Sequence, residues 1–326
     1  MERRTFIGIV AGGLLATPLA AEAQKAAMAR VGFFRPAPPS PELDRILEAF
    51  KRGLREHGYV EGQNVTIEVR FPTTTGDRLA SIAADLVHLK PDAIFAAASS
   101  GIGAVRNATR AIPIVALDLE TDPLASGIVA SLDRPGGNVT GIFLDFPELG
   151  GKWLELVKEV APKVSRVAVL WDPATGRVPL KGAEAAAPSL RLQLQVLEAR
   201  GPGDFEAVFQ SAIRARAGAV VTLSSPVFNT YRRLLVDLAA KHRLPTIMPF
   251  PLFADDGGLI AYGPDLVELY RQAGLMVGKV LKGAKPRDLP IERPNLFVLV
   301  VNMQTAKTLG VTIPQSVLIR ADRVIE

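Results

Sequence analysis

Residues 31–70 read VGFFRPAPPSPELDRILEAFKRGLREHGYVEGQNVTIEVR and contain a complete strand–helix–strand unit. The first four residues form an apolar, partly aromatic run typical of a buried strand. Ile46, Phe50 and Leu54 then recur at i, i+4 and i+8, the spacing of one face of a helix, and Asn64–Arg70 supplies the next strand. A buried strand followed by an amphipathic helix and a second strand predicts an α/β fold.

The same alternation continues to the end of the chain. Short apolar strands separated by amphipathic helices indicate parallel sheets that are covered on both faces. Eleven strands are more than one doubly wound sheet holds comfortably, so we expect two Rossmann-like lobes. The predicted strands are Val31–Phe34, Asn64–Arg70, Ala93–Ala97, Ile112–Leu117, Asn138–Phe143, Val167–Trp171, Leu192–Leu197, Ala219–Leu223, Pro245–Pro249, Leu259–Tyr262 and Leu296–Val301.

Glycine clusters mark the expected boundaries between the lobes. One cluster runs from Gly136 to Gly151, and a second lies between Gly257 and Gly263. At each cluster we expect the chain to cross from one lobe to the other. Two such crossings predict two lobes joined by a hinge, and neither lobe is then formed by one continuous segment of the chain. We expect a first lobe at 28–145 completed by about 261–285, and a second lobe at 146–260. Residues 286–326 form a strand–helix segment that the sequence does not assign to either lobe.

The N-terminus has the composition of an export signal. Arg3 and Arg4 precede an apolar run of roughly 15 residues, which is shorter than the ~20 that a membrane-spanning helix needs. Ala21-Glu22-Ala23 then matches a signal-peptidase site, so we expect cleavage before Gln24 and a periplasmic or secreted protein. The arginine pair fits a twin-arginine leader or a chance pair in an ordinary secretory signal.

Composition excludes several classes of site. The 326 residues contain no cysteine, which excludes disulfides, thiolate metal sites, a cysteine nucleophile and a lipid-modified N-terminal cysteine. The formal net charge is +5 and is spread along the chain, without the basic stripe and interleaved aromatics of a nucleic-acid-binding surface. We therefore expect a monomer that binds no nucleic acid, no metal and no cofactor.

Six further segments are informative in their order and spacing, namely 50–65, 108–115, 131–141, 167–173, 258–264 and 301–310. Together they resemble one family of ABC-transporter substrate-binding proteins, in which some members bind tryptophan or tyrosine. The resemblance runs from about Arg30 to the C-terminus. It implies a type I periplasmic-binding-protein fold, a small-molecule ligand, with an amino acid as the first candidate, and an ABC permease as partner.

Candidate ligand contacts in the first lobe lie where predicted strands end. Ligands of open parallel sheets bind beyond the carboxyl ends of the strands, where helix N-termini expose N–H groups. Ser99 and Ser100 follow the third strand and are candidates to hold a carboxylate, or are plain helix caps. Asp118 follows the fourth strand, near Glu120, and is a candidate partner for a ligand ammonium. Phe34 ends the first strand and is expected either in the pocket wall or in the core.

Candidate contacts in the second lobe occupy corresponding places. Asp172 follows Trp171 at the end of a strand and either recognises charge or caps a turn. Ser224 and Phe250 end two later strands. Tyr262 lies by the return crossing, where its ring is expected either to stack on the ligand or to pack at the hinge.

The motifs of common α/β enzymes are absent from the sequence. No G-x-S-x-G elbow is present, and Gly101-Ile102-Gly103-Ala104-Val105-Arg106 lacks the last glycine of a dinucleotide fingerprint. We therefore expect a solute-binding component of an ABC importer that captures its ligand by hinge closure and is not an enzyme. A ligand-sensing module for a receptor, or an enzyme with an unrecognised site, are the alternatives.

Overall fold

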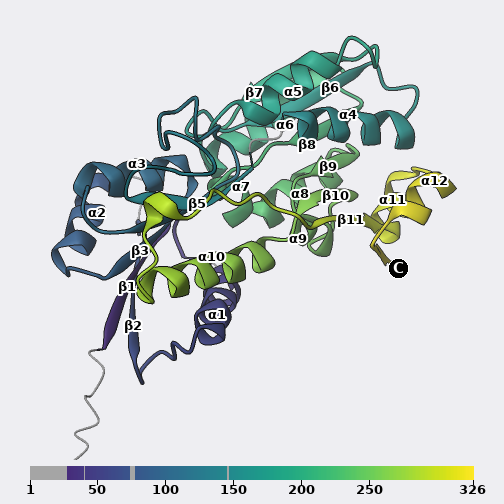
Figure 1. The fold of residues 1–326 in the computed structure, drawn as a ribbon. Coiled ribbons are helices and arrows are strands. Elements are labelled where there is room, and N and C mark those ends of the chain that lie inside the picture. The colour runs from purple at the N-terminus through teal and green to yellow at the C-terminus, as the bar shows by residue number, and fades with distance from the viewer. Residues whose placement is uncertain (1–27, 40, 74–77, 145–146) are drawn as a thin grey trace, which may run out of the picture.

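The computed structural model describes residues 28–39, 41–73, 78–144 and 147–326. The predicted signal peptide at 1–23 lies outside this range. Two α/β lobes lie side by side, with the N-terminal lobe on the left of Figure 1. Within the described part of the chain, no helix is both long and apolar enough to span a membrane.

The first lobe is built on a parallel five-stranded sheet with the order β2-β1-β3-β4-β5. Adjacent residues of its central strands point to opposite faces, so Phe33 packs beneath α1 and α10 while Phe34 packs beneath α2 and α3. The strands are β1 (Ala29–Phe34), β2 (Val65–Arg70), β3 (Ala93–Ala97), β4 (Ile114–Asp118) and β5 (Val139–Phe143), and the helices are α1 (Pro41–Glu56), α2 (Leu79–His88), α3 (Ala98–Ala108) and α10 (Leu266–Leu281).

The second lobe is built on a seven-stranded sheet with the order β12-β11-β10-β9-β8-β6-β7. Its strands pair in parallel except for β10 and β11, which pair antiparallel. Helix α4 packs with α5, and α6 packs with α8. The strands are β6 (Arg166–Trp171), β7 (Gln193–Glu198), β8 (Ala219–Thr222), β9 (Thr246–Met248), β10 (Ile260–Pro264), β11 (Phe297–Asn302) and β12 (Arg323–Ile325). The helices are α4 (Glu148–Val160), α5 (Val178–Ala186), α6 (Pro202–Arg214), α7 (Pro226–Thr230), α8 (Arg232–Lys241), α9 (Pro251–Asp255), α11 (Met303–Leu309) and α12 (Gln315–Arg320).

The chain crosses between the lobes three times, where two crossings were expected. The first crossing joins β5 to α4 and the second joins β10 to α10. After the short helix η1 (Pro286–Asp288), Glu292 pairs with Ile142 of β5, and the chain then crosses a third time to β11. Strand β10 therefore belongs to the second lobe, and the return to the first lobe begins at α10 rather than near 261. The C-terminal segment that the sequence left unassigned is divided between the two lobes at this third crossing.

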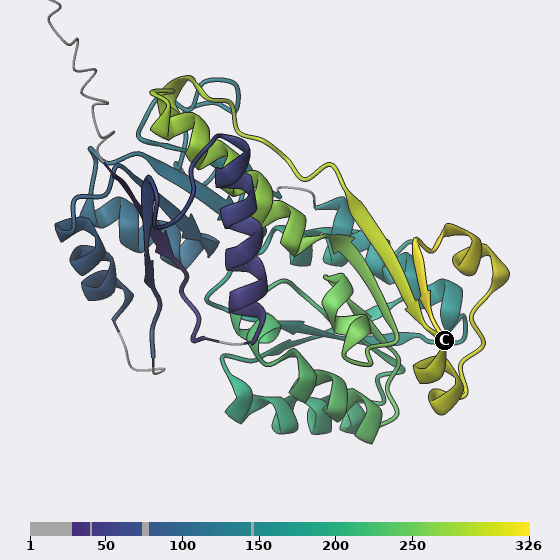
Figure 2. The ribbon, with the colours of Figure 1, turned by 90° about the horizontal axis from the view of Figure 1, so that it is seen from below.

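The strand order of each lobe reverses direction once. In the first sheet the reversal falls between β1 and β3, and in the second it falls between β6 and β8. Loops at such switch points leave a crevice beyond the carboxyl ends of the strands, which is where ligands of doubly wound sheets bind. Residues that follow β1, β3 and β8 line one shared cavity, so these strand ends of the two lobes (Figure 2) lie toward each other.

Candidate ligand-binding site

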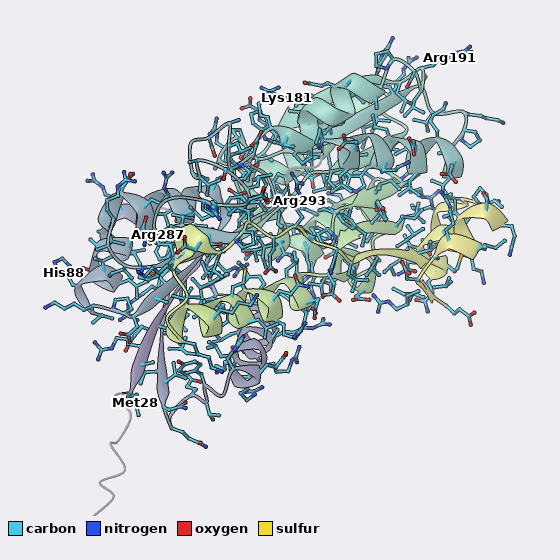
Figure 3. All side chains as sticks on the ribbon, viewed as in Figure 1. Met28, His88, Lys181, Arg191, Arg287 and Arg293 are labelled. Atoms are coloured by element: carbon cyan, nitrogen blue, oxygen red, sulfur yellow. The ribbon has the colours of Figure 1, made fainter. Side chains whose placement is uncertain are left out.

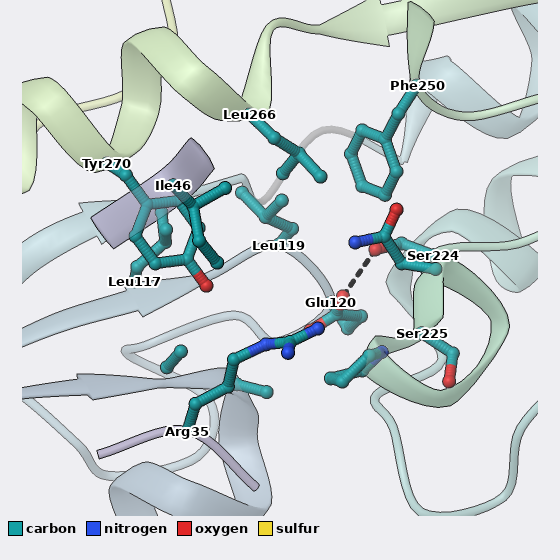
Figure 4. A pocket seen from close by; sticks show the side chains of 14 residues that line it. Arg35, Ile46, Leu117, Leu119, Glu120, Ser224, Ser225, Phe250, Leu266 and Tyr270 are labelled. Atoms are coloured by element: carbon teal, nitrogen blue, oxygen red, sulfur yellow. Dashed lines mark hydrogen bonds between the residues drawn. The ribbon is translucent and has the colours of Figure 1, made fainter. Parts of the chain in front are cut away.

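A small cavity lies between the lobes at these two switch points (Figure 4). Arg35 follows β1, Ala97 and Ala98 lie at the end of β3, and Ser224 and Ser225 follow β8. Its free volume is about 50 Å³, which is small for a ligand pocket, since such pockets typically measure about 300–1,000 Å³. A solute of amino-acid size therefore fits only if the lobes or the lining side chains move apart.

Arg35 is a buried cation in the wall of the first lobe and is 3% exposed. Its Nη1 donates to the carbonyl of Pro38 at 3.3 Å, and its Nη2 donates to Thr230 Oγ1 of the second lobe at 3.2 Å. A guanidinium has five N–H donors in a planar fork that suits a carboxylate. Arg35 therefore offers a donor surface for an anionic group while it also joins the two lobes.

Two acids lie at the end of β4. Asp118 is fully buried, and its Oδ1 accepts the backbone N–H groups of Glu120 at 3.0 Å and Thr121 at 3.2 Å. Glu120 is 4% exposed and lines the cavity, while Asp118 lies behind it. The Oε1 of Glu120 accepts the Ser224 hydroxyl of the second lobe (Figure 4). Burial and the adjacent Asp118 charge raise the pKa of Glu120 well above the ordinary glutamate value.

The wall of the second lobe is formed by residues after β8 and β9. Ser225 caps α7 by accepting the N–H groups of Val227 and Phe228, and its hydroxyl donates to Asp172 Oδ2 at 2.7 Å. Asp172 therefore lies behind the wall and orients Ser225. Asn229 lines the cavity, and its Oδ1 has no hydrogen-bond donor among the described residues.

Two aromatic rings complete the lining. Phe250 lies in the second lobe with its ring 6.5 Å from that of Phe253. Tyr270 comes from α10 in the first lobe, with its ring 5.3 Å from that of Phe95. Burial raises the pKa of Tyr270 against the opposing effect of the nearby Arg35 guanidinium, so the phenol stays neutral. The remaining wall is aliphatic, formed by Ile46, Leu117, Leu119 and Leu266.

Further contacts hold the two lobes together around this cavity. Arg232 of α8 forms an ion pair with Glu42 of α1 at 3.6 Å, and both side chains are buried. A Cβ atom added to Gly176 in the second lobe would lie 2.1 Å from the carbonyl oxygen of Glu120 in the first. These contacts describe a closed arrangement of the lobes.

The predicted site residues are distributed unevenly with respect to this cavity. Ser224 and Phe250 lie on its wall, and Asp118 and Asp172 lie directly behind wall residues. The other four do not line it, since Ser99 and Ser100 lie in the first turn of α3, Phe34 packs in the core, and Tyr262 packs against Phe297 with ring centroids 6.1 Å apart.

Arg35, Glu120 and Tyr270 are among the wall residues that were not predicted as contacts. Arg35 directly follows Phe34, where β1 ends as predicted, so the wall residue is the one after the predicted contact. Glu120 lies two residues after Asp118, in the turn that Asp118 caps after β4. Tyr270 lies inside a helix, where a rule based on strand ends does not apply.

Groups of three or more histidine, cysteine, aspartate or glutamate residues suited to a metal do not occur among the described residues. The side chains of the cavity wall supply a guanidinium, one carboxyl group, hydroxyls, an amide and two aromatic rings. A cavity between two α/β lobes, lined mainly by apolar side chains with a few polar groups, is typical of a site for a small solute.

The chain belongs to the family of ABC transporter substrate binding proteins, whose model matches residues 39–325. A tyrosine-binding protein from Clostridioides difficile (strain R20291) is 29% identical over 272 residues, covering 82% of this chain and 77% of that protein. These matches confirm the family that the sequence segments indicated, and its members are solute-binding proteins.

Two solved structures show the same fold. A conserved domain protein from Vibrio cholerae has a TM-score of 0.83 at 26% identity, covering 91% of this chain and 99% of that one. An ABC domain from Streptococcus pneumonia in complex with L-Trp has a TM-score of 0.82 at 26% identity, covering 92% and 100%. The predicted type I periplasmic-binding-protein fold is confirmed.

Proposed function

We propose that this protein is the solute-binding component of an ABC importer and that it captures an amino acid, or a similar small polar or aromatic solute, between its lobes. The observation that carries the proposal is the cavity between the lobes, with a guanidinium, a carboxyl group and two aromatic rings on its walls. A zwitterion needs a cationic and an anionic partner, and Arg35 and Glu120 supply one of each. Relatives that bind tyrosine and tryptophan support the same class of ligand.

The mechanism is reversible closure. In the open protein the strand-end loops of both lobes are accessible, and a solute docks on one of them before the hinge closes. Closure removes water, which strengthens the charge-assisted hydrogen bonds of the site. A dissociation constant of about 1 µM corresponds to about 8 kcal/mol, which a few such bonds and a stacked ring can supply. The closed protein then delivers the solute to a membrane permease.

Export is part of this proposal. A component that meets solutes outside the inner membrane must leave the cytoplasm, and the leader sequence before Gln24 supports this. N-terminal sequencing of protein recovered from the periplasm is expected to begin at Gln24. A product that retains Met1 and remains in the cytoplasm would contradict export.

The binding test begins with native mass spectrometry of freshly purified protein, which is expected to retain a small molecule. Calorimetric titration with the twenty amino acids then identifies the best probe, with L-tryptophan and L-tyrosine tested first. Arg35→Gln should weaken binding about 10- to 100-fold, because it removes a charged donor worth about 1.5–3 kcal/mol. Arg191→Gln is the matched control, because Arg191 is exposed at the far tip of the second lobe (Figure 3). If none of the amino acids binds, the proposed ligand class is wrong.

A further inference from the structure

A buried arginine of the second lobe pairs with an acid of the first lobe outside the cavity. Arg232 is the first residue of α8 and is 9% exposed, and Glu42 lies in the first turn of α1 and is 3% exposed. Their ion pair joins Nη2 to Oε2 at 3.6 Å. Neither side chain lines the cavity. The pair is therefore a contact of the closed arrangement that does not touch a solute in the cavity.

Contacts within the second lobe hold Arg232 in place whether or not the lobes are closed. Its Nε lies 2.7 Å from Asp256 Oδ2 after the end of α9, and its Nη1 donates to the carbonyl of Asn229 at 3.2 Å. Both partners belong to the second lobe, so the guanidinium keeps its position when the lobes separate. An anchored cation loses little conformational freedom when its partner from the other lobe arrives.

Glu42 lacks such an anchor in the described part of its own lobe. Its other carboxyl oxygen, Oε1, is buried and has no hydrogen-bond donor among the described residues. The charges of Arg35 and Arg45 in the first lobe also favour the ionised form of Glu42. These two arginines move with Glu42, so their effect is present before and after closure. The charges that closure adds come from the second lobe, namely the cation of Arg232 and the anion of Asp256.

Closure takes Glu42 out of water, and a buried carboxylate without a counter-charge is strongly destabilising. We propose that Arg232 compensates this burial and thereby sets how tightly the closed protein holds its solute, without contacting the solute. The inference rests on the proposed function, since it requires closure around a solute, and it adds a determinant of affinity outside the cavity. Without Arg232, closure would bring Glu42 toward Asp256 and remove the cation that lies between them.

This role has a kinetic consequence. Removal of one member of a buried charge pair chiefly speeds dissociation, whereas exposed charges at the rim of an interface chiefly affect association. Loss of Arg232 therefore leaves docking on the open protein unchanged and speeds the opening of the closed protein. Because neither Arg232 nor Glu42 lines the cavity, different solutes should be affected by the same factor.

The experiment measures binding of L-tryptophan and L-tyrosine to Arg232→Gln by calorimetric titration and by stopped-flow fluorescence. The affinity for both probes should fall by the same factor, about 10- to 100-fold, and most of the loss should lie in the dissociation rate. Arg233→Gln is the matched control, because the Arg233 side chain is 75% exposed and pairs at 3.0 Å with Asp256 of its own lobe. The affinity of this control should stay within about threefold of the wild type.

A double variant separates this role from a purely structural one. Arg232→Gln also removes the contacts to Asp256 and Asn229, so a damaged second lobe would weaken binding too. Adding Glu42→Gln in the first lobe does not restore those contacts, but it removes the carboxylate that has lost its counter-charge. Because replacing both members of a buried pair is often nearly neutral, the double variant should recover to within about threefold of the wild type. Glu42→Gln alone should change the affinity little, since no charge is then buried at this position.

The outcomes distinguish this inference from the proposed function. Equal affinity of Arg232→Gln and the wild type overturns the inference and leaves the proposed function intact. A double variant as weak as Arg232→Gln also overturns it, because the loss then arises within the second lobe. If circular dichroism shows that Arg232→Gln does not fold, Glu42→Lys replaces it, since this variant places a cation against Arg232 and changes nothing inside the second lobe. Wild-type affinity in Glu42→Lys overturns the inference. If no amino acid binds the wild type, the proposed ligand class and this inference both fall.

Discussion

At the scale of single residues, Gly176 decides how closely the lobes approach. Its missing side chain lets the loop after β6 lie against the backbone of Glu120, because a Cβ would come within 2.1 Å of that carbonyl oxygen and 3.0 Å of Thr121 Oγ1. The atoms that a Cβ would meet first belong to the backbone of Glu120 in the opposite lobe, and backbone atoms cannot rotate away as a side chain can. A side chain at position 176 is therefore expected to destabilise the closed arrangement and to leave the stability of each lobe unchanged.

Gly176→Ala is expected to weaken ligand binding about 5- to 150-fold, the equivalent of about 1–3 kcal/mol of overpacking. Calorimetric titration measures the affinity, and small-angle scattering with and without ligand measures closure. The melting temperature of the ligand-free variant should match that of the wild type. Gly203→Ala is the control, since a Cβ there meets nothing within 4 Å. Unchanged affinity together with unchanged compaction would show that the lobes do not close onto Gly176.

The residues of the site show what a sequence can predict. The rule that ligands bind beyond strand ends selected Ser224 and Phe250, which line the cavity between the lobes. The rule did not distinguish residues of the cavity wall from residues that lie behind that wall. Which of the two a residue becomes depends on the conformation of the turn that follows each strand. Ala98, with φ of +57°, opens α3 and lines the cavity, whereas the serines after it do not. Tyr270 reaches the cavity through packing of α10 against the first sheet, a long-range contact that no local pattern encodes.

At the scale of elements, α1 and α10 form the closest helix pair of the first lobe (Figure 2). The close approach occurs where Gly53 faces Gly274. A Cβ on Gly53 would lie 2.0 Å from the carbonyl oxygen of Arg271, and one on Gly274 would lie 2.1 Å from that of Phe50. Because α10 enters the first lobe only after the second crossing, this packing fixes the path of the chain between the lobes.

Gly274→Ala should lower the free energy of unfolding by about 1–3 kcal/mol or more, because the added methyl group collides with the backbone of α1. Thermal and urea unfolding followed by circular dichroism measure the change. Gly103→Ala in α3 is the matched helical control, where a Cβ meets nothing within 4 Å. That variant should be up to about 1 kcal/mol more stable, since alanine favours helix more than glycine does. Equal melting temperatures for the two variants would contradict the packing argument.

The elements themselves were largely predictable. Each of the eleven predicted strands corresponds to an observed strand with ends shifted by a few residues at most, because continuous apolar runs flanked by helical periodicity are a strong signal. The strand β12 was not predicted, since Arg323–Ile325 is short and mostly exposed. The third crossing was also missed. It follows Glu292, whose pairing with Ile142 depends on the position of β5 and not on a local glycine signal.

At the scale of the whole molecule, closure places acids in an apolar environment. Glu42 and Glu120 belong to the first lobe, and both are buried where the second lobe covers them. Burial is the largest cause that raises the pKa of each. In an open arrangement the same carboxyl groups face water, so we expect their pKa values there to be closer to ordinary. Closure without ligand therefore requires these carboxyl groups to take up protons. At neutral pH this requirement disfavours the closed state.

The ligand-free protein is consequently expected to close as the pH falls. A carboxyl group whose pKa is higher in the closed state stabilises that state at low pH, and the effect is lost as the pH rises through the raised value. The pH range of this effect begins near the ordinary glutamate pKa of 4.5, below which the carboxyl groups are protonated in both states, and extends upward to the raised pKa of the closed state.

Small-angle scattering of the ligand-free protein from about pH 7.5 to pH 5 should show a decreasing radius of gyration. Circular dichroism verifies that the fold is retained. In Glu120→Gln the neutral amide does not titrate, so this variant should be more compact than the wild type at neutral pH and should change less on acidification. An unchanged or growing radius in the folded wild type would mean that the buried acids do not govern closure, and the lobes would then be held apart by the hinge alone.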